Sequence, residues 1–363
     1  MKRTFAENVR IVWVITSKDL IDGIKNKNVI TLIISALFIV LVYKYLPGLT
    51  AEDGPPALLV YAAGESKLLT ELENSPAVDL YTYKSEEDMK YYLTNGEEPE
   101  LGLVIPANFN AALDSGNGLE LQGYMLHFFK EDEVLDLKRY MEDEFTTLLG
   151  QPVTISIERI PLQPETGGVT VLTSMGFAFV TIMVGMMVTP HMMIDEKQEK
   201  TLDALMISPA NGWHIVLAKA LTSLIYTLLL LFIALIFNWN IIQQGWLFLL
   251  GGLMGALFAI ALGLCLGILI ESRQQLTLWA WVALIPLFIP MMLSLMDDLF
   301  PEKVVKLFNL IPSSAMFRVF RTSMSGTTPL GYFAPQLVNL AIFSGIFMIM
   351  AAWLVRRQNV SKG

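Results

Sequence analysis

Charged residues are scarce in this chain of 363 residues: they make up 16% of it, whereas 54% is hydrophobic. A soluble globular domain ordinarily contains about a quarter charged residues. The chain therefore has too little polar surface for a soluble protein. Its composition predicts a membrane protein.

Residues that could support catalysis or metal binding are also few. Cys265 is the sole cysteine, which excludes an intrachain disulfide, and its apolar surroundings favour a small packing residue in a membrane helix. The histidines His127, His191 and His214 do not pair at metal-ligand spacing, so we expect no metal site. His191 fits a solvated interfacial residue better than a proton relay or a substrate contact.

Several nucleotide-binding and hydrolase motifs are missing. The sequence contains no G-x-x-x-x-G-K-[ST] phosphate loop, no H-E-x-x-H motif and no G-x-S-x-G motif. We therefore expect a chain that is not itself an enzyme and binds no cofactor. Nothing in it suggests a nucleic-acid partner.

Basic residues are scarce between residues 47 and 165, which hold about two-thirds of all acidic residues. This region is also the longest stretch without an apolar run of membrane length. It predicts a soluble acidic domain, residues 47–166, inserted into a membrane protein. Its bases are Lys67, Lys84, Lys90, Lys130, Lys138, Arg139 and Arg159.

Six apolar segments are long enough to cross a bilayer, which takes about 20 mostly apolar residues. The predicted fold is therefore a polytopic α-helical membrane protein with six transmembrane helices and an inserted α/β domain. The first span is residues 29–46, and the region 167–363 contains the other five. The segments are Val29–Leu46, Val169–Ile194, Ile215–Phe237, Trp246–Ile270, Leu276–Met296 and Phe333–Val355.

The basic residues predict the orientation in the membrane. An even number of spans places both termini on one side, and short cytoplasmic loops are enriched in Lys and Arg. We expect a multi-pass protein of the plasma membrane, of prokaryotic type, with cytoplasmic termini and residues 47–166 external. The predicted cytoplasmic bases are Lys2, Arg3, Arg10, Lys18, Lys25, Lys27, Lys197, Lys200, Arg273, Arg356, Arg357 and Lys362.

The N-terminal residues 1–28 have two early bases, but their apolar run is too short for a signal peptide and no small-residue cleavage site follows. Apolar residues recur at near-helical spacing between residues 5 and 24. This pattern favours a helix lying in the cytoplasmic membrane interface, with Trp13 at headgroup depth. The alternative is a basic tail that only sets the orientation.

The acidic domain alternates strand and helix signals, which predicts a small α/β domain. Five short apolar or alternating runs indicate strands: 57–64, 78–83, 101–106, and the runs "LELQGYML" and "VTISIERI". Helical signals lie at 85–96, at "ANFNAALDSGNG" and at 131–149.

One further segment does not cross the membrane. Residues 309–326 are amphipathic but too short, so we expect a re-entrant or interfacial helix on the external side, with Arg318 and Arg321 near headgroups.

In the fourth span, Gly251-x-x-x-Gly255 and Gly263-x-x-x-Gly267 allow close helix approach. Such spacings serve either packing within one chain or a dimer face.

The first predicted cytoplasmic loop after the acidic domain, residues 195–214, begins "DEKQEKTLDALMISP". Six of its first nine residues are acids or bases, and Pro209 ends the amphipathic part. Thr201, Leu202, Leu205 and Met206 form a short apolar face at i, i+1, i+4 and i+5. Such a face can enter a groove on a partner protein.

This loop resembles that of the ABC-2 transporter permeases. Their loop has an acidic start, a Thr-Leu pair, a further leucine, a Thr/Ser-Pro and a lysine entering the next span. The usual glycine before the threonine is Lys200 here. The corresponding positions are Glu196, Glu199, Thr201, Leu202, Leu205, Ser208, Pro209 and Lys219. The stretch "LVIPANFNAALDSG" (103–116) is similar to the external domain of the longer export branch, whose members are linked with drugs, sodium or lipids.

The resemblance implies a non-catalytic permease subunit of an ATP-driven exporter. Two permeases, identical or paralogous, then assemble with two separate ABC ATPase subunits, which bind ATP and Mg²⁺. On this hypothesis Glu196, Glu199, Thr201, Leu202, Leu205, Met206 and Pro209 couple the permease to its ATPase. A simple topological loop that caps a helix is the alternative for this stretch.

Two other functions compete with this one. A membrane-anchored sensor or assembly platform would use the external domain to bind a ligand or partner. A secondary transporter is disfavoured, because the span centres hold almost no ionisable residues. The sequence does not identify a substrate, although a mostly apolar pathway favours amphipathic or hydrophobic cargo over a free ion.

Overall fold

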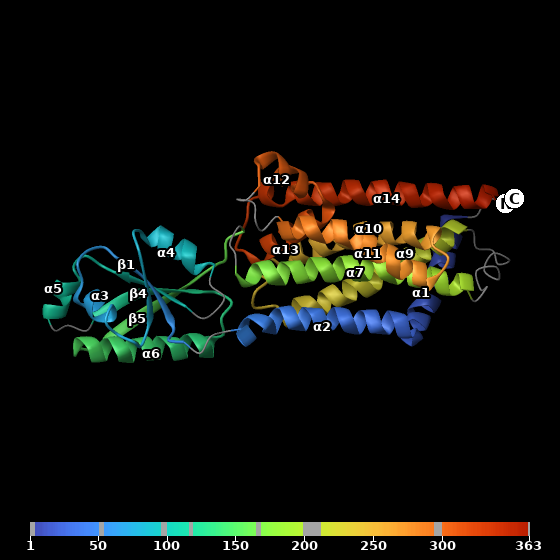
Figure 1. Ribbon diagram of the computed structural model, residues 1–363. Helices are drawn as coiled ribbons and strands as arrows, with labels where there is room; N and C mark the ends of the chain where they lie inside the picture. The colour runs from blue at the N-terminus through green and yellow to red at the C-terminus, as the bar shows by residue number, and fades with distance from the viewer. Residues whose placement is uncertain are drawn as a thin grey trace.

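The computed structural model describes residues 4–50, 54–95, 100–115, 119–164, 168–198, 212–293 and 300–361. A small α/β region lies at one end of an elongated bundle of α-helices (Figure 1). This confirms the predicted combination of apolar membrane helices and an α/β insertion. The side of the membrane on which the insertion lies stays a prediction.

The bundle consists mainly of long apolar helices. Five of the described helices are long and apolar enough to cross a membrane, and a sixth candidate is the bent pair α1 and α2, whose axes differ by 75°. These helices are α1 (Phe5–Lys25), α2 (Lys27–Thr50), α7 (Val169–Gln198), α9 (Gly212–Phe237), α10 (Gly245–Leu269), α11 (Arg273–Leu293) and α14 (Ala334–Ser361).

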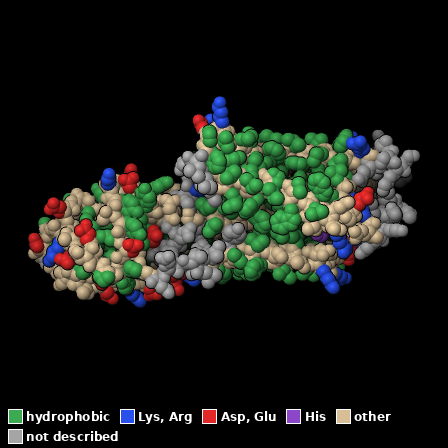
Figure 2. Space-filling model, in the orientation of Figure 1, with side chains coloured by type: hydrophobic (Ala, Val, Ile, Leu, Met, Phe, Trp, Pro, Cys, Tyr) green, Lys and Arg blue, Asp and Glu red, His purple; other side chains and the backbone are tan. Residues whose placement is uncertain are grey.

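The helices turn lipid-compatible side chains outward. Hydrophobic side chains cover the flank of the bundle, and charged side chains gather mostly at the end away from the α/β region (Figure 2). That end contains the C-terminal end of α7, the start of α9 and the C-terminal end of α14 (Figure 1). We call it the loop end, because residues 199–211 connect α7 to α9 there.

The glycines of α10 serve packing within this chain. A Cβ atom on Gly251 would lie 2.3 Å from Val319, and one on Gly255 would lie 2.5 Å from Met316. Both of these neighbours belong to α13 (Pro312–Met324). Gly263 is in contact with the backbone of α7, where an added Cβ would lie 2.5 Å from a carbonyl oxygen. The small residues therefore let α10 approach two neighbouring helices closely.

The predicted segment 309–326 forms α13, preceded by α12 (Glu302–Asn309) and followed by the short 3₁₀ helix η2 (Leu330–Tyr332). Most of α13 is buried inside the bundle, between α7, α10, α11 and α14. Its proline lies in the first turn, where the missing N–H costs no hydrogen bond. Arg318 and Arg321 are half-buried, and their contact with headgroups stays a prediction.

The α/β region contains a five-stranded sheet in the order β2-β1-β3-β4-β5. The β3–β4 pair is antiparallel and the other pairs are parallel. The strands are β1 (Ala57–Ala62), β2 (Asp79–Tyr83), β3 (Leu101–Ile105), β4 (Leu119–Leu126) and β5 (Val153–Ile160).

Helices lie on both faces of this sheet (Figure 1). One face packs against three helices, and the sheet and these helices together form the larger apolar core of the region. The helices are α3 (Lys67–Leu72), α5 (Phe109–Asp114) and α6 (Glu131–Leu149). The opposite face packs against α4 (Glu86–Leu93), through its buried residues Met89 and Leu93. The sheet is therefore more fully covered on the α6 side than on the α4 side.

Candidate functional site: the charged end of α7

The C-terminal end of α7 carries three consecutive charged residues, Asp195, Glu196 and Lys197, which are the first residues of the predicted coupling loop 195–214. Of the predicted coupling residues, Glu196 is the one that the structure describes. The others, Glu199, Thr201, Leu202, Leu205, Met206 and Pro209, lie outside the described residues. Asp195 and Glu196 are each 8% exposed, so the helix end is held inside the protein rather than in solvent.

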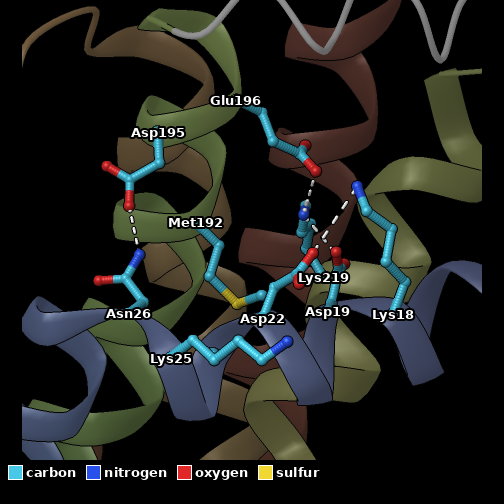
Figure 3. A pocket seen from close by; sticks show the side chains of 10 residues that line it. Lys18, Asp19, Asp22, Lys25, Asn26, Met192, Asp195, Glu196 and Lys219 are labelled. Atoms are coloured by element: carbon cyan, nitrogen blue, oxygen red, sulfur yellow. Dashed lines mark hydrogen bonds and ion pairs between the residues drawn. The ribbon is translucent and has the colours of Figure 1, made fainter.

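Asp195 binds two elements at once. One carboxylate oxygen accepts hydrogen bonds from Arg273 at the start of α11, at 2.7 Å from Nη2 and 2.8 Å from Nε. The other oxygen lies 2.5 Å from the side-chain amide nitrogen of Asn26, at the bend between α1 and α2 (Figure 3). This carboxylate therefore joins α7 to α11 and to the first bent helix pair.

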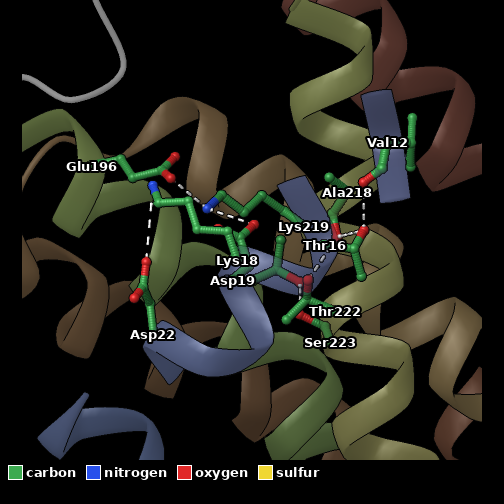
Figure 4. A network of polar contacts seen from close by, with 11 residues as sticks. Val12, Thr16, Lys18, Asp19, Asp22, Glu196, Ala218, Lys219, Thr222 and Ser223 are labelled. Carbon is green, nitrogen blue, oxygen red and sulfur yellow. Dashed lines mark hydrogen bonds and ion pairs between the residues drawn. The ribbon is translucent and has the colours of Figure 1, made fainter. Parts of the chain in front are cut away.

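Glu196 forms an ion pair with Lys219 of α9. The Lys219 Nζ lies 2.7 Å from Glu196 Oε1 and 2.9 Å from Asp19 Oδ2 of α1. Lys219 thus lies between two carboxylates that come from different helices (Figure 4). We call Asp19, Glu196 and Lys219 the buried triad.

The buried triad is almost completely removed from water. The side chains of Lys219, Asp19 and Glu196 are 1%, 3% and 11% exposed. Desolvating charges is costly, and the mutual attraction of such ions offsets that cost only when their geometry is good. One ammonium group also has to compensate two carboxylates. Removal of Lys219 would therefore take the shared ammonium group away from two buried carboxylates.

Lys197 binds the C-terminal end of α10. Its Nζ donates to the carbonyl oxygens of Gly267, Ile268 and Ile270, at 2.8, 3.1 and 3.0 Å. The last carbonyls of a helix lack intrahelical donors, and a cation there also interacts favourably with the helix dipole. Lys197 therefore fixes α10 to the end of α7.

Helix α1 is attached to α9 along most of its length. The His214 ring lies 3.0 Å from Asn8 Oδ1, and the Tyr226 hydroxyl donates to the Leu20 carbonyl at 2.6 Å. Between these contacts lies the ion pair of Asp19 with Lys219. A Cβ on Gly23 would lie 2.5 Å from the Tyr226 hydroxyl, so a glycine is needed for this close approach. Together these contacts hold α1 against α9.

The opposite side of α1 is apolar and exposed. Phe5, Val9 and Trp13 are 85%, 50% and 55% exposed, and Ile21 and Ile24 are also exposed. An exposed apolar stripe on a helix suits the membrane interface. The position of Trp13 at headgroup depth nevertheless stays a prediction.

A polar pocket of about 360 Å³ opens beside the buried triad (Figure 3). Groups of both signs line it, which suits polar contacts better than an apolar cargo. Residues of α1, α7 and α9 line it. The lining residues are Lys18, Asp19, Asp22, Gly23, Lys25, Asn26, Met192, Asp195, Glu196 and Lys219.

Most of these partners were not predicted from the sequence. Asp19, Asn26 and Arg273 lie far in sequence from the residues that they bind. One local signal was present: Lys219 lies within an apolar helix, and a buried lysine requires an acidic partner. Because the sequence holds many acids, that signal does not identify the two that bind it.

The family model for ABC-2 family transporter proteins matches residues 27–353. This chain belongs to the ABC-2 transporter family. The match runs from α2 into α14 and therefore includes the α/β region as well as the membrane helices. Comparison with curated proteins gives no match.

Membership in this family indicates a transmembrane component of an ABC transporter. Members of the family are the membrane transport component and are not themselves catalytic. ABC-2 permeases normally work with ABC ATPase subunits. The predicted resemblance is thus confirmed at the level of the family.

Proposed function

We propose that this chain is the permease subunit of an ATP-driven exporter in the plasma membrane. It assembles with a second copy or a paralogue and with two separate ATPase subunits, which bind ATP and Mg²⁺. The family match supports the transporter class. The absence of a phosphate loop from the sequence agrees with an ATPase on another chain.

The loop between α7 and α9 receives the ATPase in this proposal. The apolar face of Thr201, Leu202, Leu205 and Met206 enters a groove on the ATPase, as amphipathic helices do in other complexes. Glu199 provides polar contacts beside it, and Pro209 ends the helix. Glu196 acts differently, because its carboxylate is bound to Lys219 within this chain.

One observation carries the coupling mechanism: the three residues before this loop bind four other elements. Asp195 binds α11 and the bend between α1 and α2, Glu196 binds α9, and Lys197 binds α10. A displacement of the loop therefore acts on these elements together. The buried triad extends this link from α9 to α1.

The sidedness of the protein follows from the same proposal. The loop end faces the cytoplasm, where ATP is available, and the α/β region is external. In support, α14 ends at the loop end (Figure 1), and its last turns contain Arg356 and Arg357.

Copurification tests the coupling hypothesis. We expect a tagged permease to retain its ATPase subunit, and the variants Leu202→Asp and Leu205→Asp to lose it, because a charge is costly in an apolar groove. Asn211→Asp is the control, since it adds an acid to the same loop without removing an apolar residue. Unchanged ATPase association and transport in both leucine variants would refute the hypothesis.

The cargo of the exporter is amphipathic or hydrophobic in this proposal, because the interior of the bundle is mostly apolar. The permease and its ATPase would be reconstituted together in vesicles, and ATP turnover measured with added lipids, cationic drugs or peptides. We expect lipids or amphipathic drugs to stimulate turnover. Stimulation by a hydrophilic peptide alone would contradict the proposed class of cargo.

A further inference from the structure

Four tyrosines lie together on the α4 side of the α/β region. Tyr81 and Tyr83 belong to β2, and Tyr91 and Tyr92 belong to α4. We call them the tyrosine surface. Hydrophobic side chains, a class that includes tyrosine, are visible over α4 (Figure 2).

Three of the rings, those of Tyr83, Tyr91 and Tyr92, are in contact at different angles. Tyr83 and Tyr92 stack with their ring centroids 4.9 Å apart. Tyr91 and Tyr92 meet edge to face, at 5.6 Å and an interplanar angle of 83°. The face of an aromatic ring attracts a cation, as in the aromatic cages that bind quaternary ammonium groups.

The tyrosine surface is open to solvent. Tyr81, Tyr91 and Tyr92 are 47%, 52% and 53% exposed. The strand β2 is at the edge of the sheet, and α4 is the described helix that packs on this face. Exposed aromatic residues in such numbers are unusual on a solvated acidic domain and indicate a binding surface.

Carboxylates lie beside the rings. The Tyr81 hydroxyl donates to Asp79 Oδ2 at 2.7 Å. This hydrogen bond and the charge of Asp79 raise the pKa of Tyr81, and Glu100 acts in the same direction. Burial raises the pKa of Tyr83, and Glu100 contributes to that increase. The surface therefore combines aromatic faces with the negative charges of Asp79 and Glu100, and both favour a cation.

The same domain already holds an ammonium group in this way. Lys90 Nζ lies 3.8 Å from the centroid of the Tyr124 ring and 2.7 Å from Glu86 Oε1. That site is filled by a side chain of the chain itself. The tyrosine surface offers similar groups, an aromatic face and a nearby carboxylate, to a ligand from solution.

We propose that the tyrosine surface binds a soluble organic cation, an ammonium compound whose charge lies against the rings of Tyr91 and Tyr92. The charge complementarity of Asp79 and Glu100 favours this occupant over an anionic or neutral one. The inference is independent of the exporter mechanism, because it concerns the α/β region and not the loop end.

Binding is tested with the full chain in maltoside micelles, which contain no ammonium group. Choline is the probe, and its neutral analogue 3,3-dimethylbutan-1-ol has the same shape without the charge. Ligand-observed NMR titrations give both affinities. We expect choline to bind and the neutral analogue to bind several-fold more weakly.

Variants locate the binding site. Tyr92→Leu should weaken choline binding about two- to fivefold, the range for loss of one exposed cation–π contact. Glu100→Gln should also weaken it, and more so at low salt. Tyr140→Leu is the control, because Tyr140 is an exposed tyrosine of α6 on the other side of the sheet. Near-native thermal unfolding of each variant would exclude misfolding.

Several outcomes would overturn the proposal. Equal affinity for choline and its neutral analogue would show that the charge is not recognised, and equal losses in Tyr92→Leu and Tyr140→Leu would place the binding elsewhere. Loss of choline binding in phosphatidylcholine nanodiscs would assign the surface to lipid headgroups. A change of oligomeric state in Tyr92→Leu would assign it to a second copy of the chain.

Discussion

Charged residues have different surroundings at the loop end of the bundle and in the α/β region. Lys219 is 1% exposed and lies between two carboxylates. In the α/β region, the pair Lys130–Glu133 has side chains that are 65% and 40% exposed and nitrogen and oxygen atoms 3.7 Å apart. Buried pairs are costly to break, whereas exposed pairs contribute about 0–1 kcal/mol. The few charges of the bundle therefore matter more to its structure than the many charges of the α/β region.

The largest effect is expected from Lys219→Met. The change takes the shared ammonium group away from the buried carboxylates of Asp19 and Glu196, so we expect a loss of about 3–5 kcal/mol in the free energy of unfolding. Thermal unfolding in detergent measures it. Lys130→Met in the α/β region is the comparison and should change stability by less than about 1 kcal/mol. Equal losses of stability in Lys219→Met and Lys130→Met would contradict the difference between the buried and the exposed ion pairs.

A variant with a neutral triad tests whether uncompensated charge causes the loss of stability. In the triple variant Lys219→Met, Asp19→Asn, Glu196→Gln no charge remains in the buried triad. We expect most of the stability lost in Lys219→Met to return, because replacing a buried ionic group by neutral residues is often tolerated. If the triple variant were as unstable as Lys219→Met, uncompensated charge would not be the cause.

An intermediate effect is expected from Asp195→Ala. It removes the hydrogen bonds to Arg273 and Asn26, and bonds to charged groups contribute about 1.5–3 kcal/mol each. Because Arg273 is half-exposed, we expect a total loss of about 1–3 kcal/mol. Glu87→Ala, an exposed acid of α4, should have an effect within about 0.5 kcal/mol. Chemical unfolding of both variants measures the two losses of stability. A loss in Glu87→Ala as large as that in Asp195→Ala would contradict the prediction.

The smallest effect, and the one that depends on pH, is expected from Glu86→Gln. The hydrogen bonds from Lys90 and from Tyr124 lower the pKa of Glu86. A carboxyl group with a lowered pKa in the folded state stabilises the fold above its unfolded pKa, and this contribution is lost as pH falls through the folded pKa. The stability difference between the native chain and Glu86→Gln should therefore be present at pH 7 and shrink below about pH 4. A difference that grows in acid would contradict it.

The sequence predicted much of the fold from local patterns. The strand and helix signals between residues 57 and 160 correspond to β1–β5, α4, α5 and α6 in the structure. The short α3 was not predicted, and neither was the antiparallel β3–β4 pair, because pairing depends on contacts between distant segments. Several membrane helices continue past their apolar runs: α7 extends to Gln198 and α14 to Ser361.

The candidate site was predicted only in part. The resemblance to the permease loop singled out Glu196 and Lys219, but it gave no reason to connect them to Asp19, which is 200 residues away from Lys219. Such a contact depends on how α1 folds back against α9. The sequence pattern of residues 5–24 shows which side of the helix is apolar. It does not show which residue Asp19 binds.

The most direct test of the coupling role of the buried triad is a distance measurement between α1 and α9. Spin labels at the exposed positions Ile21 and Leu229, in a Cys265→Ser background, report that distance. A second pair, Ile21 and Trp353 of α14, reports whether ATP moves α1 at all. With its ATPase present, we predict that ATP changes the second distance but not the first. In the neutral triple variant, ATP should change or broaden the Ile21–Leu229 distance. An identical ATP response in the native chain and the triple variant would show that the triad does not link these helices.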